Sequence, residues 1–385
     1  RGRTQFFIVF TRGTAYNVIC IRMSENKAPP AEERERSAAA ADEKRSEACK
    51  MKLAVLFGGV SSEHDISCLS AASILRNLDR EKYELYAIGI TREGRWLYCP
   101  TLDADRIENG AWERMPDLVP ALLPPDRGIH GLVLLHEDRV EHIRLDCVFP
   151  VLHGVGGEDG TVQGLLELAG IPYVGCGVAA SADTMDKSIT KCIVDGTGVR
   201  QARYYLAHKY DFERGAEGVV RTAAAQLGSF PVFVKPCSQG SSVGVAKAND
   251  MLELAAGLTE AFALDDKVLV EEFIDGQEVE CAVLGNRQPV ASTVGEIAPT
   301  QEFYTFDAKY KDESSRLYIP AHITDQQIEA VRRSALRVYT ALGCRGLSRV
   351  DFFVRRTDGE VIFNELNAIP GFTSISMYPK LFAHE

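Results

Sequence analysis

Long apolar segments are missing from the sequence. No run of 18 or more apolar residues occurs in the 385-residue chain, although 45% of its residues are hydrophobic. A helix that crosses a bilayer needs about 20 apolar residues, and the apolar stretch at 6–10 is shorter than the core of a secretory signal. The sequence therefore predicts a protein that makes no use of a membrane.

Paired cysteines are also missing. The chain has ten cysteines, but no two of them form a C-x-x-C pair, and this excludes the common zinc-finger patterns. Most of them lie inside apolar or small-residue runs, as Cys147 and Cys281 do. A long chain with scattered cysteines is typical of a reducing compartment, so we expect the protein in the cytoplasm.

Positive charge is scarce after the first 50 residues. Residues 1–50 carry ten Lys or Arg and seven Asp or Glu, which leaves 33 basic and 47 acidic side chains, a net charge of −14, for residues 51–385. An acidic body argues against nucleic acid as a partner, because such binding needs clustered positive charge. It does not exclude a phosphate ligand, which metals, backbone N–H groups and a few lysines can hold locally.

The chain divides at about residue 50. Residues 28–50 are rich in alanine and charge and have little to bury, so residues 1–50 are expected to be disordered or a non-native extension. In residues 51–175 strands alternate with helices, which predicts a parallel α/β domain. The expected strands are 52–57, 83–90, 147–152 and 171–175, and the expected helices are 67–78 and 161–169.

Two further domains are expected, at 176–267 and 268–385. The patterns predict helices at 182–196, 213–228, 251–263 and 324–342 and strands at 232–235, 243–247, 268–273, 278–284, 288–296, 349–354 and 360–365. No internal repeat is apparent, and the overall class is α/β.

One lysine is followed by a loop of small residues. Lys235 ends a predicted strand, and Ser238–Gly244 follows it with three serines and two glycines. Small residues let backbone N–H groups approach phosphate oxygens, and the lysine adds a positive charge. It is not a P-loop, because the lysine precedes the glycines. Taken alone, the run favours a phosphate site no more than a plain Ser/Gly hairpin.

Two predicted strands near the end of the sequence carry oxygen ligands. Asp351 lies on the first, and Glu365 and Asn367 lie at the end of the second. The flanking residues are apolar, so these carboxylates are expected to be buried, which is costly without a cation. Mg²⁺ prefers such oxygen ligands, and we favour a magnesium site over a solvated hairpin.

Polar residues also follow two strands of the first domain. The run Gly58–Ser67 lacks the G-x-G-x-x-G pattern of a dinucleotide site, and its acidic Glu63 would suit an ammonium group. Ser62 or Asp65 could cap the following helix. In Leu152–Gly160, His153 follows a strand where open α/β sheets bind ligands, whereas Glu158 and Asp159 are interpreted as structural turn residues.

Taken together and in this order, these runs resemble the D-alanine–D-alanine ligases of the ATP-grasp superfamily, over residues 51–385. The matching pieces are Phe57–Glu63, Leu152–Gly160, Met185–Lys187, Lys235–Gly244, Ala308–Tyr310, Arg349–Asp351 and Asn364–Ser376. The resemblance implies a three-domain ATP-grasp fold, an ATP-dependent and Mg-dependent ligase of peptidoglycan synthesis, two Mg²⁺ ions that Mn²⁺ can replace, and a homodimer.

The resemblance also implies roles for individual residues. Lys187, Lys235 and Ser242 would contact nucleotide phosphates; Glu271, Glu272, Ile274 and Glu278 would hold adenine and ribose; and Asp351, Glu365 and Asn367 would hold the metal ions. Glu63, linked to Ser241 and Tyr310, would receive the first D-alanine near His153. Arg349 and the N–H of Gly371 would form an oxyanion hole. Lys309, Ser376 and Met377 would bind substrate, with Ser376 taking the second carboxylate.

The implied chemistry is activation of a carboxylate by ATP. The acyl phosphate would be attacked by the second amine, with Arg349 stabilising the oxyanion, while a loop at 298–316 would exclude water. Two departures stand out: Ala368 replaces the usual threonine after Asn367, and the family normally continues past Glu385 through a final helix, so the last domain is expected to be truncated.

Other functions remain open at this point. The runs at 63–65 and 88–96 are similar to those of resistance-type ligases, so a D-alanine–D-serine ligase is the alternative. A nucleotide-binding protein without turnover is a second alternative, against which the complete set of charged residues argues. A dinucleotide oxidoreductase is remote, because the sequence lacks its glycine pattern.

Overall fold

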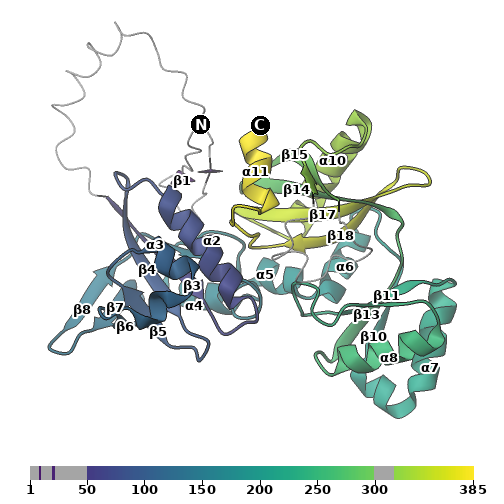
Figure 1. The fold of residues 1–385 in the computed structure, drawn as a ribbon, viewed down its shortest axis with the longest axis horizontal. Coiled ribbons are helices and arrows are strands. Elements are labelled where there is room, and N and C mark those ends of the chain that lie inside the picture. The colour runs from purple at the N-terminus through teal and green to yellow at the C-terminus, as the bar shows by residue number, and fades with distance from the viewer. Residues whose placement is uncertain (1–7, 10–19, 22–49, 299–315) are drawn as a thin grey trace, which may run out of the picture.

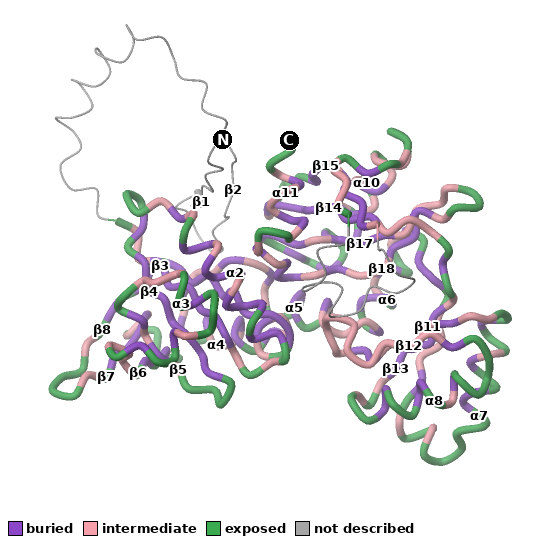
Figure 2. Tube along the Cα trace, in the orientation of Figure 1, coloured by how far each residue is buried: buried purple, intermediate pink, exposed green. Residues whose placement is uncertain are grey.

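The computed structural model describes residues 8–9, 20–21, 50–298 and 316–385. Figure 1 shows the N-terminal domain at the left, the central sheet at the lower right and the C-terminal sheet at the upper right. Each sheet is covered by helices, and Figure 2 shows that the buried residues run along the strands and the inner sides of these helices. Ahead of them, β1 (Ile8–Val9) and β2 (Cys20–Ile21) form a short antiparallel pair.

The N-terminal sheet has seven strands in the order β8-β7-β6-β5-β4-β3-β9. They are β3 (Met51–Gly58), β4 (Tyr83–Ile90), β5 (Trp96–Cys99), β6 (Val119–Leu122), β7 (Gly131–Leu135), β8 (Val140–Arg144) and β9 (Cys147–Pro150). Only β4 and β9 pair in parallel with β3, and the others are antiparallel. The expected strands at 52–57, 83–90 and 147–152 therefore pair in parallel as predicted, but the four strands β5–β8 were not predicted and pair antiparallel, so the sheet is mixed.

Strand β3 forms the centre of this domain because its alternate residues face opposite sides of the sheet. Leu53 and Val55 pack with α2 (His64–Asn77), and Ala54 and Leu56 pack towards α4 (Thr161–Ala169). The small helices α3 (Ala104–Glu108) and η1 (Ala111–Arg114) join the α2 side. The strand expected at 171–175 is wrong, because this segment contributes a single bridge to β9.

The central sheet has four antiparallel strands in the order β10-β13-β11-β12. They are β10 (Tyr204–His208), β11 (Val232–Pro236), β12 (Ala246–Ala248) and β13 (Lys267–Glu272), and α7 (Lys209–Leu227) and α8 (Met251–Phe262) cover one face. The strand expected at 243–247 begins only at Ala246, because the chain before it forms the Ser/Gly loop, in which Ser241 and Ser242 have φ of 50° and 60°. Since β13 lies inside this sheet, we place the end of the central domain after Glu272 rather than at 267.

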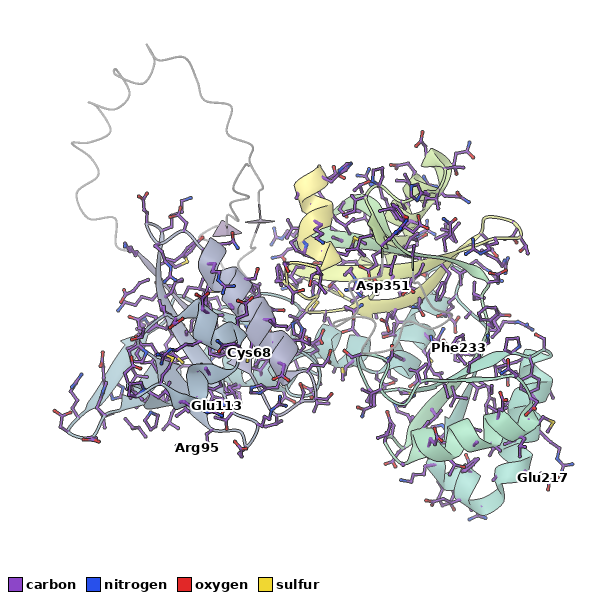
Figure 3. The ribbon with its side chains drawn as sticks, viewed as in Figure 1. Cys68, Arg95, Glu113, Glu217, Phe233 and Asp351 are labelled. Atoms are coloured by element: carbon purple, nitrogen blue, oxygen red, sulfur yellow. The ribbon has the colours of Figure 1, made fainter. Side chains whose placement is uncertain are left out.

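The C-terminal sheet is antiparallel, in the order β16-β15-β14-β17-β18. Its strands are β14 (Gly276–Leu284), β15 (Val290–Ala298), β16 (Arg316–Tyr318), β17 (Leu347–Arg355) and β18 (Val361–Asn367). The expected hairpin of 349–354 and 360–365 is confirmed as β17 and β18. The long helix is also confirmed as α10 (Asp325–Ala341), which begins at a capping box formed by Thr324 and Gln327. Figure 3 labels Asp351 on this sheet and Phe233 on the central one.

Three shorter helices border the C-terminal sheet. The helix expected at 182–196 is two helices, α5 (Val178–Met185) and α6 (Lys187–Asp195), and α11 (Met377–His384) packs on β14 and β15. The break lies at Asp186, which has extended backbone and whose Oδ1 accepts N–H bonds from Ser188 (2.9 Å) and Ile189 (3.3 Å). This cap places Lys187 at the beginning of α6. None of the helices in the described ranges is long and apolar enough to span a membrane.

Candidate active site

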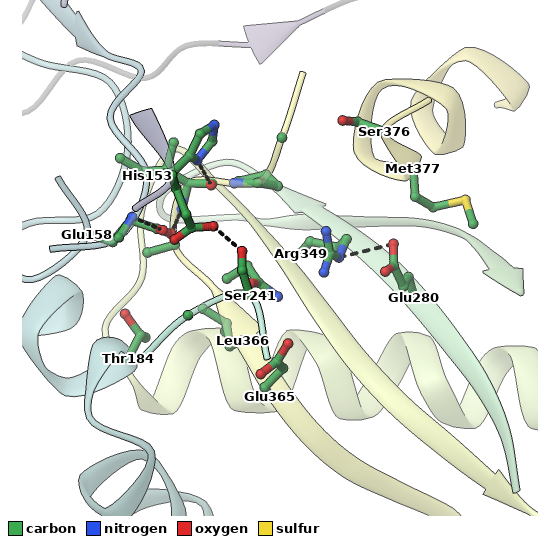
Figure 4. Close-up of a pocket in the computed structure, with 18 of the residues that line it drawn as sticks. His153, Glu158, Thr184, Ser241, Glu280, Arg349, Glu365, Leu366, Ser376 and Met377 are labelled. Carbon is green, nitrogen blue, oxygen red and sulfur yellow. Dashed lines mark hydrogen bonds and ion pairs between the residues drawn. The ribbon is translucent and has the colours of Figure 1, made fainter. Parts of the chain in front are cut away.

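Two cavities lie side by side where the three domains meet. The larger, of about 600 Å³, lies between the central and C-terminal sheets and includes Lys235, Ser242, Glu271, Glu272, Ile274 and Glu278 in its lining. The smaller, of about 140 Å³, includes Glu63, His153, Arg349, Asn367, Gly371, Ser376 and Met377 (Figure 4). Lys187, Ser241 and Glu365 line both, so the cavities share a wall.

The structure thus gathers the residues that the sequence singled out. Every predicted site residue in the described ranges lines one of the two cavities, with the exception of Asp351, which is 2% exposed beneath Arg349. Lys309 and Tyr310 lie outside the described residues. The roles of individual residues remain predictions.

A buried cluster of three charges lies at the back of the larger cavity. Glu271 Oε2 is 2.6 Å from Lys235 Nζ and its Oε1 is 2.7 Å from Lys191 Nζ. Burial by itself raises the pKa of Glu271, but the two ammonium groups outweigh it and lower this pKa to about 2. Lys235 also donates to Asn364 Oδ1 at 3.2 Å. The cluster therefore fixes the ammonium of Lys235 at the cavity wall.

Carboxylates form a row across three strands of the C-terminal sheet. Glu280 on β14 lies opposite Asp351 on β17, which lies opposite Glu365 on β18. Asp351 accepts two hydrogen bonds from Arg349, at 2.8 and 2.7 Å, and one from Asn367 Nδ2 at 3.0 Å. Three carboxylates thus lie in register beside one guanidinium, which leaves an excess of negative charge at the wall shared by the cavities.

Glu63 lies at the first turn of α2, and its carboxylate is held from another domain. Neither Ser62 nor Asp65 caps this helix: the capping residue is Glu63 itself, without a side-chain cap bond. Ser241 Oγ, from the Ser/Gly loop, donates to Glu63 Oε1. A Cβ on Gly154 or Gly240 would come within 2.8 Å of Glu63 Oε2. Both loops therefore approach this carboxylate closely, and the φ of 71° at Gly154 favours glycine there.

His153 fastens the segment that follows β18. Its Nδ1 is 3.0 Å from the carbonyl oxygen of Ile369, and its Nε2 is 3.1 Å from Ser70 Oγ, which accepts the N–H of Phe372 at 3.2 Å. Since a carbonyl only accepts, the proton of the neutral ring lies on Nδ1. Burial lowers the pKa of His153, so the ring is neutral at pH 7. His153 lines the smaller cavity, but both of its nitrogens bind protein groups.

Glu158 fastens the same segment, although the sequence suggested only a turn residue. Its Oε1 accepts the N–H of Ile369 at 2.8 Å, and its Oε2 accepts the N–H of Gly154 at 2.9 Å (Figure 4). Asp159, by contrast, is a turn residue as expected, because it accepts from Gly156 and Thr161 in its own loop. Glu158 and His153 together hold both the N–H and the C=O of Ile369, two residues before Gly371.

The Glu158 carboxyl should make the stability of the folded protein depend on pH. Burial, with the nearby Glu63 carboxylate, raises the pKa of Glu158 to about 8 against the two N–H donors. Between pH 4.5 and 8 Glu158 is then ionised in the unfolded chain but protonated in the folded protein. The free energy of unfolding therefore falls as pH rises through this window. Relative to Glu158→Gln, the wild type should lose up to about 1.4 kcal/mol per pH unit over this window in denaturant titrations. A difference that grows with pH would show that the two N–H donors dominate instead.

The second half of the smaller cavity is formed by the chain that leads into α11. Ser376 Oγ accepts the N–H of Thr373 at 3.0 Å and lies 2.8 Å from the Thr373 hydroxyl. A Cβ on Gly371 would approach Ser376 Oγ to 2.7 Å. The backbone at Gly371 therefore lies close to this hydroxyl.

The sequence reasoning missed four residues of this site. They are Ser70, Lys191, Glu158 and Glu280. Each of the four contacts another residue of the site and so helps to hold that residue in place. Glu280 carried a signal, because it alternates with Glu278 on a predicted strand and so faces the same side. The others depend on contacts between residues more than 75 positions apart, which no local pattern encodes.

Comparison with known proteins gives the same family for both halves of the chain. The D-ala D-ala ligase N-terminus family matches residues 52–176, and the D-ala D-ala ligase C-terminus family matches residues 193–385. D-alanine–D-alanine ligases of Caldicellulosiruptor bescii and Acetivibrio thermocellus are both 48% identical to this chain. The alignments cover 86% of this chain and 90% and 91% of those proteins.

Solved structures agree with the sequence comparisons. A D-Ala:D-Ser ligase from Enterococcus faecalis superposes with a TM-score of 0.78 at 38% identity, covering 87% of this chain and 94% of that one. The D-alanine–D-alanine ligase from Coxiella burnetii has a TM-score of 0.74 at 33% identity, covering 87% and 90%. The expected three-domain ATP-grasp fold is thereby confirmed. The chain belongs to the D-alanine–D-alanine ligase family.

Proposed function

We propose that this protein joins two D-alanine molecules into D-alanyl-D-alanine, with ATP converted to ADP and phosphate, as a step of peptidoglycan precursor synthesis. The observation that carries the proposal is the contact between Ser241 and Glu63. It joins the loop that follows Lys235 to an acidic group that suits an ammonium, so that a nucleotide and an amino acid would meet at one wall. The matches to D-alanine–D-alanine ligases over 86% of the chain support it.

The larger cavity suits the nucleotide. Its volume of about 600 Å³ lies within the usual range of ligand sites. Lys187 and Lys235 would neutralise phosphate oxygens, and the Ser242 backbone would approach them closely. Glu272 at the end of β13, Ile274 just after it and Glu278 on β14 line the same cavity and would contact adenine and ribose. The side chain of Glu271 instead holds Lys235.

The residues at the shared wall fit a magnesium site. Asp351 and Glu365 lie opposite each other in the β17–β18 register. The side-chain amide of Asn367 faces Asp351 and donates a hydrogen bond to it. Two carboxylates and an amide oxygen are the ligands that Mg²⁺ prefers, with waters and phosphates completing the shell. Bound Mg²⁺ or Mn²⁺ would spread the charge of the transferred phosphoryl group.

The smaller cavity suits the two amino acids. Glu63 would bind the ammonium of the first D-alanine, whose carboxylate oxygen attacks the γ-phosphorus and releases ADP. The uncharged amine of the second D-alanine then attacks the acyl carbon. Phosphate leaves with the C–O bond electrons, and the proton that the amine loses passes to the phosphate or to solvent. Arg349 and the N–H of Gly371 would stabilise the oxyanion in between, and Ser376 would hold the second carboxylate beside Met377. Lys309 and Tyr310 remain predicted contributors.

The test is the dependence of phosphate release on the amino acid. With ATP and Mg²⁺, D-alanine should start phosphate release, and mass spectrometry should find one D-alanyl-D-alanine per phosphate. D-alanine, D-serine and D-lactate supplied together should still give mainly D-alanyl-D-alanine. Phosphate release without D-alanine, or none at all, would refute the proposed ligase activity.

The D-serine alternative is not favoured. The curated relatives at 46–48% identity are D-alanine–D-alanine ligases, although one similar structure is a D-Ala:D-Ser ligase. A cytoplasmic location is part of the same proposal, because ATP and the precursors of the cell wall are available there. A homodimer is proposed as well, from the family resemblance. Size-exclusion chromatography with light scattering tests the dimer directly.

A further inference from the structure

Arg349 lies between two buried carboxylates on neighbouring strands. Asp351 is two residues away on β17, and Glu280 reaches over from β14, with its Oε2 3.1 Å from Arg349 Nε (Figure 4). The side chain of Glu280 is 4% exposed and that of Arg349 is 16% exposed, so this pair is shielded from water. Glu280 also lines the smaller cavity.

The two carboxylates hold the guanidinium in different ways. The Nε–H of Arg349 points at Asp351 Oδ1, 2.8 Å away, and Nη2 donates to Asp351 Oδ2 at 2.7 Å. Glu280 shares the Nε side of the guanidinium as an ion-pair partner. Two anions on this side leave the opposite edge of the planar group directed away from them. That edge is the part of Arg349 that can meet an oxyanion.

Asp351 is proposed to hold a metal ion as well as Arg349. The proposed function assigns it to a metal ion, which would draw charge from the same oxygens that hold Arg349. Glu280 is placed beside Asp351 in register and contacts the same Nε. It can therefore keep the guanidinium in place when the charge of Asp351 is shared with a cation.

On the basis of the proposed function, we propose that Glu280 is a positioning residue that fixes Arg349 for stabilisation of the oxyanion. It acts through Arg349 and binds neither substrate nor metal. The partner of Arg349 in the transition state is the negatively charged oxygen of the tetrahedral centre that forms when the second amine attacks the acyl carbon.

The test compares Glu280→Gln with the wild type in three measurements. The variant keeps the size of the side chain but loses its charge, and kcat should fall about 10- to 100-fold, as is usual when a partner that orients a catalytic group is removed. The KM for ATP should change less than about threefold, because the nucleotide cavity is untouched. The Kd of a dipeptide analogue with a tetrahedral phosphinate in place of the peptide bond should rise by about the same factor as kcat falls, as measured by calorimetry.

Two further variants separate positioning from a structural role. In an Arg349→Ala background, Glu280→Gln should lower kcat/KM less than about threefold further, because its partner is already gone. Glu280→Asp, which keeps the charge, should retain more activity than Glu280→Gln. Melting temperatures of all variants identify a loss that is due to unfolding. The inference would be overturned if Glu280→Gln lowered the melting temperature but left kcat and phosphinate binding, measured below that temperature, unchanged.

A matched control and a metal measurement complete the design. Glu360→Gln removes a carboxylate that pairs with Arg355 at the far end of the same sheet and should leave kcat unchanged. Mn²⁺ binding with a non-hydrolysable ATP analogue, followed by electron paramagnetic resonance, should be the same in Glu280→Gln as in the wild type. Weaker Mn²⁺ binding would make Glu280 a metal ligand and overturn the positioning role. An inactive wild type would refute the proposed function itself, whereas an active wild type matched by Glu280→Gln would refute only this inference.

Discussion

Replacing Glu365 by glutamine is expected to lower the rate of D-alanine-dependent phosphate release about 10³-fold. Glu365 lines both cavities and lies opposite Asp351 in the β17–β18 register. It is the proposed metal ligand that faces both the nucleotide cavity and the amino-acid cavity. A bound cation contributes several kcal/mol to phosphoryl transfer. About 4 kcal/mol corresponds to 10³ in rate. Coupled-enzyme detection of phosphate at saturating ATP and D-alanine measures the loss.

The same variant should bind Mn²⁺ and the ATP analogue more weakly while its melting temperature stays near that of the wild type. Glu360→Gln again provides the control, because Glu360 lies just before β18 and pairs with Arg200 and Arg355 away from the cavities. A Glu365→Gln protein with a wild-type rate would leave the metal assignment without support.

Replacing Glu271 by glutamine is expected to destabilise the fold by about 3–5 kcal/mol, the usual cost of removing one partner from a buried ion pair. Glu271 is 5% exposed, and its loss removes the carboxylate that pairs with both Lys191 and Lys235. Guanidinium titration measures the change. ATP binding should weaken as well, because Lys235 loses the partner that holds it at the cavity wall.

The acid stability of the wild type provides an independent check of the same cluster. The pKa of Glu271 is lowered to about 2, so its contribution is present above pH 4.5 and is lost as pH falls towards 2. The lowered pKa corresponds to about 3 kcal/mol over this window. Glu271→Gln should lose correspondingly less stability over the same pH range. Parallel curves for the two proteins would contradict the charge cluster.

Much of the fold could be predicted because its strongest elements are long and periodic. Strand β4, helix α4 and the hairpin of β17 and β18 follow their apolar patterns closely. Strands β5 to β8 were missed, because they have only four or five residues each and take their place in the sheet from neighbours rather than from their own pattern. Their antiparallel pairing changed the expected parallel sheet into a mixed one.

The site was predictable to the extent that its residues lie in runs. Lys235 and the Ser/Gly loop, or Glu365 and Asn367, are close in sequence and were found together. The contacts that orient them are distant in sequence. The link of Ser241 to Glu63, across 178 positions, was implied only by the family resemblance and is confirmed, whereas that of Glu158 to Ile369, across 211, was missed. Such partners are set by how the domains dock, which a single sequence does not encode in local spacing.

The hold of His153 and Glu158 on Ile369 has a pharmacological consequence. The Ile369 peptide groups are bound from the N-terminal domain through both N–H and C=O, so the position of Gly371 depends on the junction between two domains. A small molecule that mimics one peptide unit could compete for Glu158 and His153 at this junction. Given the oxyanion role proposed for Gly371, it would block the enzyme by shifting this residue, and high concentrations of ATP would not relieve the inhibition.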